Sequence, residues 1–216
     1  MAPATENAVL PLKPDVDLTT GPAAETWRST LSTIGAQPGC QRIVWGRSIE
    51  NPENAQMLID WDDISNHKTF IASAAYGPFL SGVSTLLAAP PALAHHRFAT
   101  PLAALTSGAP VTELVSFYFP AAYSDADFAG PWDEFAGVAA RHAAGLVGSA
   151  GAWGDEEVEH ASLGGERGRV FLAAIAWESV GAHMAYRETA AFKESIVKLR
   201  ALVSGIEMHH VDFKEA

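Results

Sequence analysis

The feature that most constrains the fold is an internal repeat. Two segments, residues 57–98 and 171–213, share one pattern: an apolar run ends in a Trp, a His follows six residues later, an aromatic residue follows three positions further on, and a His-His pair closes the segment. These positions are Trp61, His67, Phe70 and His95-His96 in the first segment, and Trp177, His183, Tyr186 and His209-His210 in the second. Self-similarity of this kind indicates one structural unit that is used twice.

Both halves show the same order of expected elements around this repeat. Residues 9–98 are predicted to form strand, helix, strand, strand, helix, strand; a small proline-bearing linker follows at 99–110, and residues 111–214 repeat the order. Such an order gives a four-stranded antiparallel sheet with both helices on one face, the ferredoxin-like α+β arrangement. The open face of each sheet must be buried, so we expect the two halves to pack sheet-to-sheet as an intrachain pseudo-dimeric α+β barrel.

Three element boundaries are specific enough to test. Residues 1–8 are predicted to be a loose leader, and residues 9–12 an edge strand or an extended arm because proline cannot donate to a central ladder. The second helix of the first half is expected to start at a Ser65 cap and to break at Gly77-Pro78. In the second half Asp125 or Asp127 is expected to cap the first helix.

Composition narrows the class of protein. The chain is 48% hydrophobic and 18% charged, which favours a sizeable core over disorder. Its net charge is -11 without a basic cluster, so we expect neither a nucleic-acid partner nor an anionic membrane partner. No signal peptide and no membrane-spanning apolar run is visible, and Cys40 is the single cysteine. A cytoplasmic protein is therefore expected.

The repeated Trp-x-Ser-x-x-x-His run carries a resemblance to a known family. WESVGAH at 177–183, with WDDISNH at 61–67 as its poorer copy, resembles the dimeric α+β barrel superfamily. Within that superfamily the chain is most similar to antibiotic-biosynthesis-monooxygenase-like and stress-responsive A/B barrel domains, in a tandem form common in fungi. The resemblance implies the fold over residues 9–213. Its members include cofactor-free monooxygenases, polyketide cyclases, muconolactone isomerases and haem-dependent relatives of chlorite dismutase.

The cyclase members of the superfamily use a Tyr and a His six residues apart on the helix after the third strand. The resemblance places that Tyr at Phe70 and Tyr186, and that His at Tyr76 and Phe192. Neither half therefore keeps both residues of the pair.

Candidate catalytic residues are His183, Tyr186, His67 and Tyr76, because a His with a pKa near neutrality is readily used as an acid or a base. His67 and His183 could instead brace the start of a helix against the strand Trp. The residues expected to contact a substrate are Trp177, Trp61, Phe70, Phe192, Tyr118 and His209. Tyr118 could equally be a core residue, and Glu113 is expected to be an exposed residue at the start of a strand.

Metal and cofactor sites have little support in the sequence. Successive side chains on a strand face opposite ways, so one His of each His-His pair should face the helices. The four His of the two pairs could form a metal or haem site, but no H-x-H or HExxH spacing is present. No nucleotide-binding or flavin-binding motif occurs either. We expect no cofactor and no metal, and association into a homodimer stays open.

The sequence favours a cofactor-independent enzyme of secondary metabolism that acts on a hydrophobic aromatic or polyketide-like small molecule. Proton transfer by His or Tyr at an enolisable carbon would lead to cyclisation, isomerisation, decarboxylation or monooxygenation. We expect a pocket between the sheet and helices of each half, with the second half holding the working one. The alternatives are a non-catalytic small-molecule-binding or stress-response barrel and a haem-binding barrel. An apolar pocket in which His and Tyr groups converge supports the enzyme, whereas two filled half-cores support the binding protein.

Overall fold

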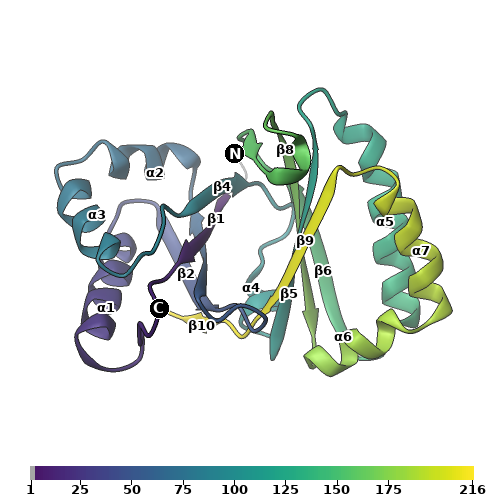
Figure 1. Ribbon diagram of the computed structural model, residues 1–216, viewed down its shortest axis with the longest axis horizontal. Helices are drawn as coiled ribbons and strands as arrows, with labels where there is room; N and C mark the ends of the chain where they lie inside the picture. The colour runs from purple at the N-terminus through teal and green to yellow at the C-terminus, as the bar shows by residue number, and fades with distance from the viewer. Residues whose placement is uncertain (1–2) are drawn as a thin grey trace. The chain divides into compact units, whose positions relative to one another are not determined.

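The computed structural model describes residues 3–216, which form two compact units (Figure 1). The first unit runs to Phe98 and includes the C-terminal segment Phe213–Ala216, and the second is Ala99–Asp212. Within the predicted linker, residues 99–110, a short helix, α4 (Ala103–Thr106), is present. Among the described residues, no helix is both long enough and apolar enough to span a membrane.

The first unit has the strand order of a ferredoxin-like fold. Its sheet runs β10-β2-β3-β1-β4 with antiparallel neighbours, and its helices lie on one side of that sheet (Figure 1). The elements are β1 (Ala4–Pro11), α1 (Gly21–Gly35), β2 (Cys40–Arg47), β3 (Asn54–Trp61), α2 (Ile64–Ile71), α3 (Tyr76–Ser84), β4 (Ala92–His96) and the C-terminal β10 (Lys214–Glu215).

The first strand corrects the prediction for the N-terminal segment. A loose leader over residues 1–8 is wrong, since Ala4–Pro11 forms a strand that pairs with β3 on one side and β4 on the other. Pro11 is tolerated because it is the last residue of the strand, where little of the ladder remains to be interrupted. Residues 1–2 of the predicted leader lie outside the described residues.

The second unit repeats this order. Its sheet runs β6-β8-β5-β9, with the short β7 paired to β8, and its main helices also lie on one side of the sheet (Figure 1). The elements are β5 (Val111–Pro120), α5 (Asp125–His142), β6 (Leu146–Trp153), β7 (Val158–Glu159), a 3-10 turn (Ala161–Leu163), β8 (Arg167–Trp177), α6 (Val180–Arg187), α7 (Ala190–Arg200) and β9 (Gly205–Val211). The ferredoxin-like halves predicted from the repeat are therefore present in both units.

The Trp of each repeat ends a strand, and the residue two positions later caps the following helix. Asp63 accepts a hydrogen bond from the Ser65 backbone N–H at 3.0 Å, and Ser179 accepts one from the Ala182 N–H at 3.1 Å. Side chains of this type satisfy backbone donors that the first helical turn leaves unpaired. The expected cap at Ser65 is thus wrong by two residues.

The single helix expected after the third strand is two helices in each unit. In the first unit the break falls after Ile71 rather than at Gly77-Pro78, because a proline in the first turn of α3 leaves that helix intact. In the second unit Thr189 starts α7 afresh by accepting a hydrogen bond from the Phe192 N–H at 3.2 Å.

At the start of α5 the N-cap is Ser124, and Asp125 and Asp127 lie in the first turn instead of capping the helix. In the first turn, the two carboxylates interact favourably with the positive end of the helix dipole and stabilise the helix.

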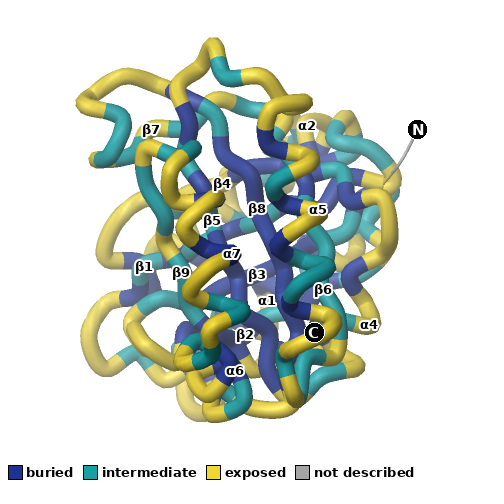
Figure 2. Tube along the Cα trace, turned by 90° about the vertical axis from the view of Figure 1, so that its right-hand side faces the viewer, coloured by how far each residue is buried: buried dark blue, intermediate teal, exposed yellow. Residues whose placement is uncertain are grey.

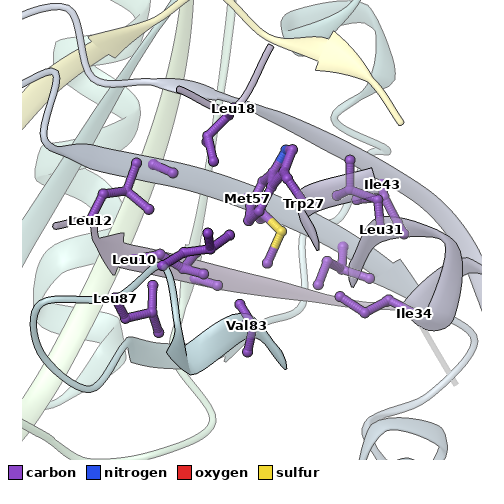
Figure 3. Packing of buried hydrophobic residues seen from close by; sticks show 14 of the residues in the cluster. Leu10, Leu12, Leu18, Trp27, Leu31, Ile34, Ile43, Met57, Val83 and Leu87 are labelled. Carbon is purple, nitrogen blue, oxygen red and sulfur yellow. The ribbon is translucent and has the colours of Figure 1, made fainter. Parts of the chain in front are cut away.

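Each core lies between a sheet and its own helices. In the first unit Leu10 and Met57 of the sheet pack against Trp27, Ile34 and Val83 of the helices (Figure 3). In the second unit β8 is buried along most of its length (Figure 2). This layer between sheet and helices is where the cavities described below are found.

Candidate functional site

A buried polar cluster lies at one end of the second core. The Trp177 indole N–H donates to Glu113 Oε2 at 3.0 Å, and His183 Nδ1 lies 3.5 Å from the same oxygen. His183 Nδ1 is also 2.8 Å from His210 Nε2, so one of these two nitrogens carries the shared proton. All four side chains are at least 95% buried. A carboxylate buried to this extent is stable only when it is paired and hydrogen-bonded.

The first unit builds the same cluster from its own residues. Trp61 donates to Glu6 Oε2 at 2.9 Å, His67 Nδ1 lies 3.2 Å from that oxygen, and His67 Nδ1 lies 2.9 Å from His95 Nε2. The repeat therefore encodes one Glu-Trp-His-His arrangement twice.

Strand register and helix spacing explain this arrangement. Glu6 pairs with His95 across β1 and β4, and Glu113 pairs with His210 across β5 and β9. Residues paired across antiparallel strands point to the same face, which here is the face under the helices. The other His of the cluster is the fourth residue of α2 or α6, and its ring stacks on the strand Trp with ring centroids 5.3 Å or 4.9 Å apart.

The structure corrects how the His-His pairs correspond. The first member of the first pair, His95, is equivalent to the second member of the second pair, His210, because each lies opposite the cluster glutamate. His209 instead pairs with Leu114 and belongs to the other face of the strand.

Both glutamates were missed by sequence reasoning. Glu6 falls in the predicted leader, and Glu113, expected to be exposed, is only 5% exposed. The available signal is a Thr-Glu dipeptide, Thr5-Glu6 and Thr112-Glu113, at the same place in both first strands. A single charged residue inside a buried strand indicates a buried partner, because charged side chains are almost never fully buried unless they are paired.

A cavity of about 340 Å³ lies in the second unit between the sheet and α5, α6 and α7. Its walls are largely apolar, and the polar cluster reaches it through Glu113, Trp177 and His183. Ligand pockets in proteins commonly start at about 300 Å³ and combine apolar walls with a few polar groups. The cavity therefore has the size and the lining of a small-molecule site.

The equivalent space in the first unit is only about 50 Å³, although Glu6, Trp61 and His67 line it in the same way. Side-chain sizes in the two linings differ in both directions: Phe135 lines the second cavity where the first unit has the smaller Thr30. Three residues that line the smaller cavity have smaller counterparts in the second unit: Met57 corresponds to Ala173, Ile34 to Ala139 and Phe79 to Ser195.

Each cavity contains a pair of aromatic side chains beside the cluster. One member of each pair is a Tyr, the first member in the second unit and the second member in the first unit. Tyr186 and Phe192 meet edge-to-face at 5.4 Å in the second unit, and Phe70 and Tyr76 do so at 5.3 Å in the first. Burial raises the pKa of Tyr186, and the Ser195 hydroxyl nearby offsets part of that effect. The Tyr186 hydroxyl is buried and makes no hydrogen bond within the part of the chain that the structure describes.

Tyr76 differs from Tyr186 in its exposure. It is half-buried, and burial and the Glu6 carboxylate together raise its pKa. Both hydroxyls are thus protonated at neutral pH and are suited to donating a hydrogen bond.

Eight of the ten residues singled out from the sequence line the two cavities. The second cavity contains Trp177, His183, Tyr186 and Phe192, and the first contains Trp61, His67, Phe70 and Tyr76. The other two lie elsewhere: His209 lines neither cavity, and Tyr118 stacks on His160 with ring centroids 3.7 Å apart. Burial, with the Glu207 carboxylate, raises the pKa of Tyr118 to about 12.

Each cluster also contains the donor set of a metal site. The ligand atoms of Glu113, His183 and His210 lie within 4.8 Å of one another, as do those of Glu6, His67 and His95. Two His and one carboxylate can hold zinc or non-haem iron. Ligand atoms about 2.1 Å from one metal stand roughly 3.0–3.4 Å apart. The His–His separations of 2.8 and 2.9 Å are those of hydrogen bonds, so the rings would have to move apart to hold an ion.

Known structures share this architecture along the whole chain. An anthrone oxidase-like protein matches with a TM-score of 0.70 at 15% identity, covering 100% of this chain and 94% of its own. A candidate monooxygenase from Fusobacterium nucleatum matches with a TM-score of 0.61 at 10% identity, covering 99% and 94%. A candidate monooxygenase from Lactobacillus acidophilus matches with a TM-score of 0.57 at 12% identity, covering 100% and 96%. No protein-family model matches the sequence, and no curated protein matches it.

The architecture shared with these full-length matches is a tandem of two ferredoxin-like α+β halves in one chain. The resemblance seen in the repeated Trp-x-Ser-x-x-x-His run is therefore confirmed for the fold. At such low identities, the likeness concerns the fold alone.

Proposed function

We propose that the second unit is the working half of a cofactor-independent enzyme that removes a proton from an enolisable carbon of a hydrophobic aromatic ketone, whose enolate then reacts with molecular oxygen. The observation that carries this proposal is the 340 Å³ apolar cavity with His183, Glu113 and Tyr186 together in its wall. An imidazole, a carboxylate and a protonated phenol are the groups that proton abstraction next to a carbonyl requires.

Each of these residues has a distinct role in the proposed step. The His183 imidazole accepts the proton as the C–H bond breaks, and the electron pair of that bond passes into the enolate. Glu113, held by the Trp177 indole, stabilises the imidazolium that forms. The Tyr186 hydroxyl donates a hydrogen bond to the developing enolate oxygen, for which a raised pKa keeps it protonated.

Oxygen is the proposed co-reactant because of the activities for which the matched structures are named, an anthrone oxidase-like protein and two candidate monooxygenases. The enolate carbon is oxidised and dioxygen is reduced to a hydroperoxide at that carbon. Loss of one water then leaves a second carbonyl. One ketone methylene and one dioxygen thus give one quinone and one water, and no other oxidant is needed.

The first experiment isolates the proton transfer. Anthrone is incubated with the full chain in D2O without oxygen, and deuterium entry at its methylene carbon is followed by NMR. Wild-type protein should accelerate exchange, and His183→Ala should lower the rate by about 10²–10⁴-fold. His67→Ala makes the same change at the equivalent site and should leave the rate near that of wild type. Equal losses in the two folded variants would contradict the assignment to the second unit.

Oxygen chemistry is tested separately. With ¹⁸O₂, the quinone should gain one labelled oxygen and oxygen uptake should equal quinone formed. Enzyme-dependent deuterium exchange without oxygen incorporation would retain proton abstraction and replace oxygenation by isomerisation or cyclisation.

A non-catalytic binding module is the second candidate, and one observation favours it. The same Glu-Trp-His-His cluster persists in the first unit beside a cavity of only 50 Å³. There the stacked Trp61 and His67 hold the start of α2 against the sheet, which is the bracing role expected for them. Ligand binding without any acceleration of deuterium exchange would establish this candidate for the second unit as well.

A further inference from the structure

Two arginines lie at the wall of the second cavity, and neither forms an ion pair within the described residues. Arg187 is the last residue of α6 and Arg200 the last of α7, and both line the cavity. Neither guanidinium lies within 4 Å of a carboxylate among the described residues, and Arg187 donates only a long hydrogen bond to Met184 Sδ at 3.8 Å. The neighbouring Glu188 attracts Arg187, but its carboxylate pairs with Lys193 at 2.9 Å. Arg187 is half-buried and Arg200 is exposed, so they mark the mouth of the cavity.

The first unit lacks this feature. The residues at the equivalent positions, at the ends of α2 and α3, are Ile71 and Ser84. Arginines at these two positions are therefore present only in the unit that has the larger cavity.

The chemistry of the lining points to a ligand with two unlike ends. The interior is formed by apolar side chains such as Val115, Ile175 and Met208, which suit a flat hydrocarbon body. A guanidinium offers a planar fork of donors that matches the two oxygens of a carboxylate. An anion at the mouth would remain partly hydrated, which avoids the cost of burying an unpaired charge.

We propose that this cavity selects aromatic ketones that carry a carboxylate, with the acid group bound by Arg187 and Arg200 and the ring system inside. This inference rests on the proposed function, since it names the substrate class for the same site. In that orientation the ring system extends from the mouth toward His183 and Tyr186.

The test uses two probes of nearly equal shape, anthraquinone-2-carboxylate and the neutral anthraquinone-2-carboxamide, titrated into the full chain by tryptophan fluorescence. The acid should bind about tenfold more tightly than the amide, a preference of roughly 1.4 kcal/mol. The double variant Arg187→Gln/Arg200→Gln should lose the preference while keeping the affinity for the amide. The corresponding double Lys variant should retain part of it, since it keeps the charge but loses the planar fork. Added salt should reduce the preference in the wild type.

A matched control distinguishes the effect of the two arginines from the effect of positive charge elsewhere on α7. Lys198 lies on α7 and is exposed, and it pairs with Glu134 at 2.6 Å; Lys198→Gln should therefore leave both affinities unchanged. Thermal unfolding of each variant confirms that it is folded.

The possible outcomes have different meanings. Equal affinity for acid and amide, unaltered in the double Gln variant, would overturn the inference and leave the proposed function standing. Tighter binding of anthraquinone-2-sulfonate than of the carboxylate would overturn it in favour of a tetrahedral anion. Absence of binding by all probes would contradict the proposed function together with the inference.

Discussion

At the scale of single residues, the site depends on a glutamate that both units bury beneath their helices. Glu6 and Glu113 are 4% and 5% exposed, and each is held by an indole N–H and faced by an imidazole. Because the two glutamates have matching partners, the cluster alone does not distinguish a catalytic unit from a structural one. What differs is the residue three positions after the cluster His, which is Phe70 in one unit and Tyr186 in the other.

The Tyr186 hydroxyl is expected to lower the stability of the folded protein and to raise its activity. Its buried hydroxyl has no hydrogen-bond partner among the described residues, and a buried unsatisfied hydroxyl costs about 1–3 kcal/mol. Tyr186→Phe should therefore raise the free energy of unfolding by roughly 1 kcal/mol, measured by urea denaturation. The same variant should lower the deuterium-exchange rate about 10–100-fold, because the enolate oxygen loses its donor. A variant that is both less stable and fully active would refute this role.

At the scale of elements, a short motif sets both the helix start and the site. The Trp that ends the third strand is followed after two residues by the helix cap and after six by the cluster His. The cap is Asp63 in one unit and Ser179 in the other, so only one of them titrates. Hydrogen bonds from Ser65, its backbone N–H first, with Arg97 nearby, lower the pKa of the Asp63 carboxyl.

This difference predicts a pH dependence confined to α2. A carboxyl with a lowered pKa in the folded state contributes stability above its ordinary pKa of about 4, and that stability is lost as the pH falls through the lower folded value. Hydrogen-exchange protection of residues 64–71 should therefore drop between about pH 5 and pH 3, after correction for intrinsic rates. Residues 180–187, capped by Ser179, serve as the reference within the same chain. Parallel loss in both helices would argue against the cap.

The elements show how much the sequence could predict. Apolar periodicity and the repeat gave the order of strands and helices in both halves, since those patterns follow directly from burial of one face. The first strand was expected at residues 9–12 as an edge strand or an arm, whereas it spans Ala4–Pro11 between two neighbours, because a proline and a glutamate interrupt its apolar pattern. The cluster His and Trp were found through their spacing, but their glutamate partners were not, since pairing depends on strand register. Cavity volume was not predictable either, because it depends on how several side chains pack together.

At the scale of the whole chain, duplication has left two units with one arrangement and unequal space. The second cavity is about 340 Å³ and the first about 50 Å³. Only the second unit has a cavity large enough for a small molecule, whereas the core of the first unit is nearly filled. We therefore expect one ligand per chain. The residues that differ between the two cavities can be exchanged by mutation, which tests whether they set the cavity volume.

Moving first-unit residues into the second unit should close its cavity. Ala139→Ile introduces the counterpart of Ile34 at a residue that lines the cavity, and Ala173→Met introduces that of Met57 on the same strand face as the lining residue Ile175. Filling an existing cavity costs less than overpacking a full core, so the free energy of unfolding should change by less than about 1.5 kcal/mol. Ligand binding and deuterium exchange should be abolished. The control Ala143→Ile adds the same side chain in the same unit, at a residue that does not line the cavity, and should leave binding intact. Retained binding in the folded double variant would place the ligand elsewhere.

We propose that the cavity of the second unit, and not that of the first, receives an aromatic ketone beside His183 and Tyr186. A crystal structure of the full chain with a bound dihydroxyanthraquinone measures this most directly. We expect one ligand per chain in the cavity beneath α5 and α7, with a ligand carbonyl within hydrogen-bond distance of the Tyr186 hydroxyl and the ring system against His183. A ligand in the first unit, or one bound elsewhere while this cavity stays empty, would contradict it.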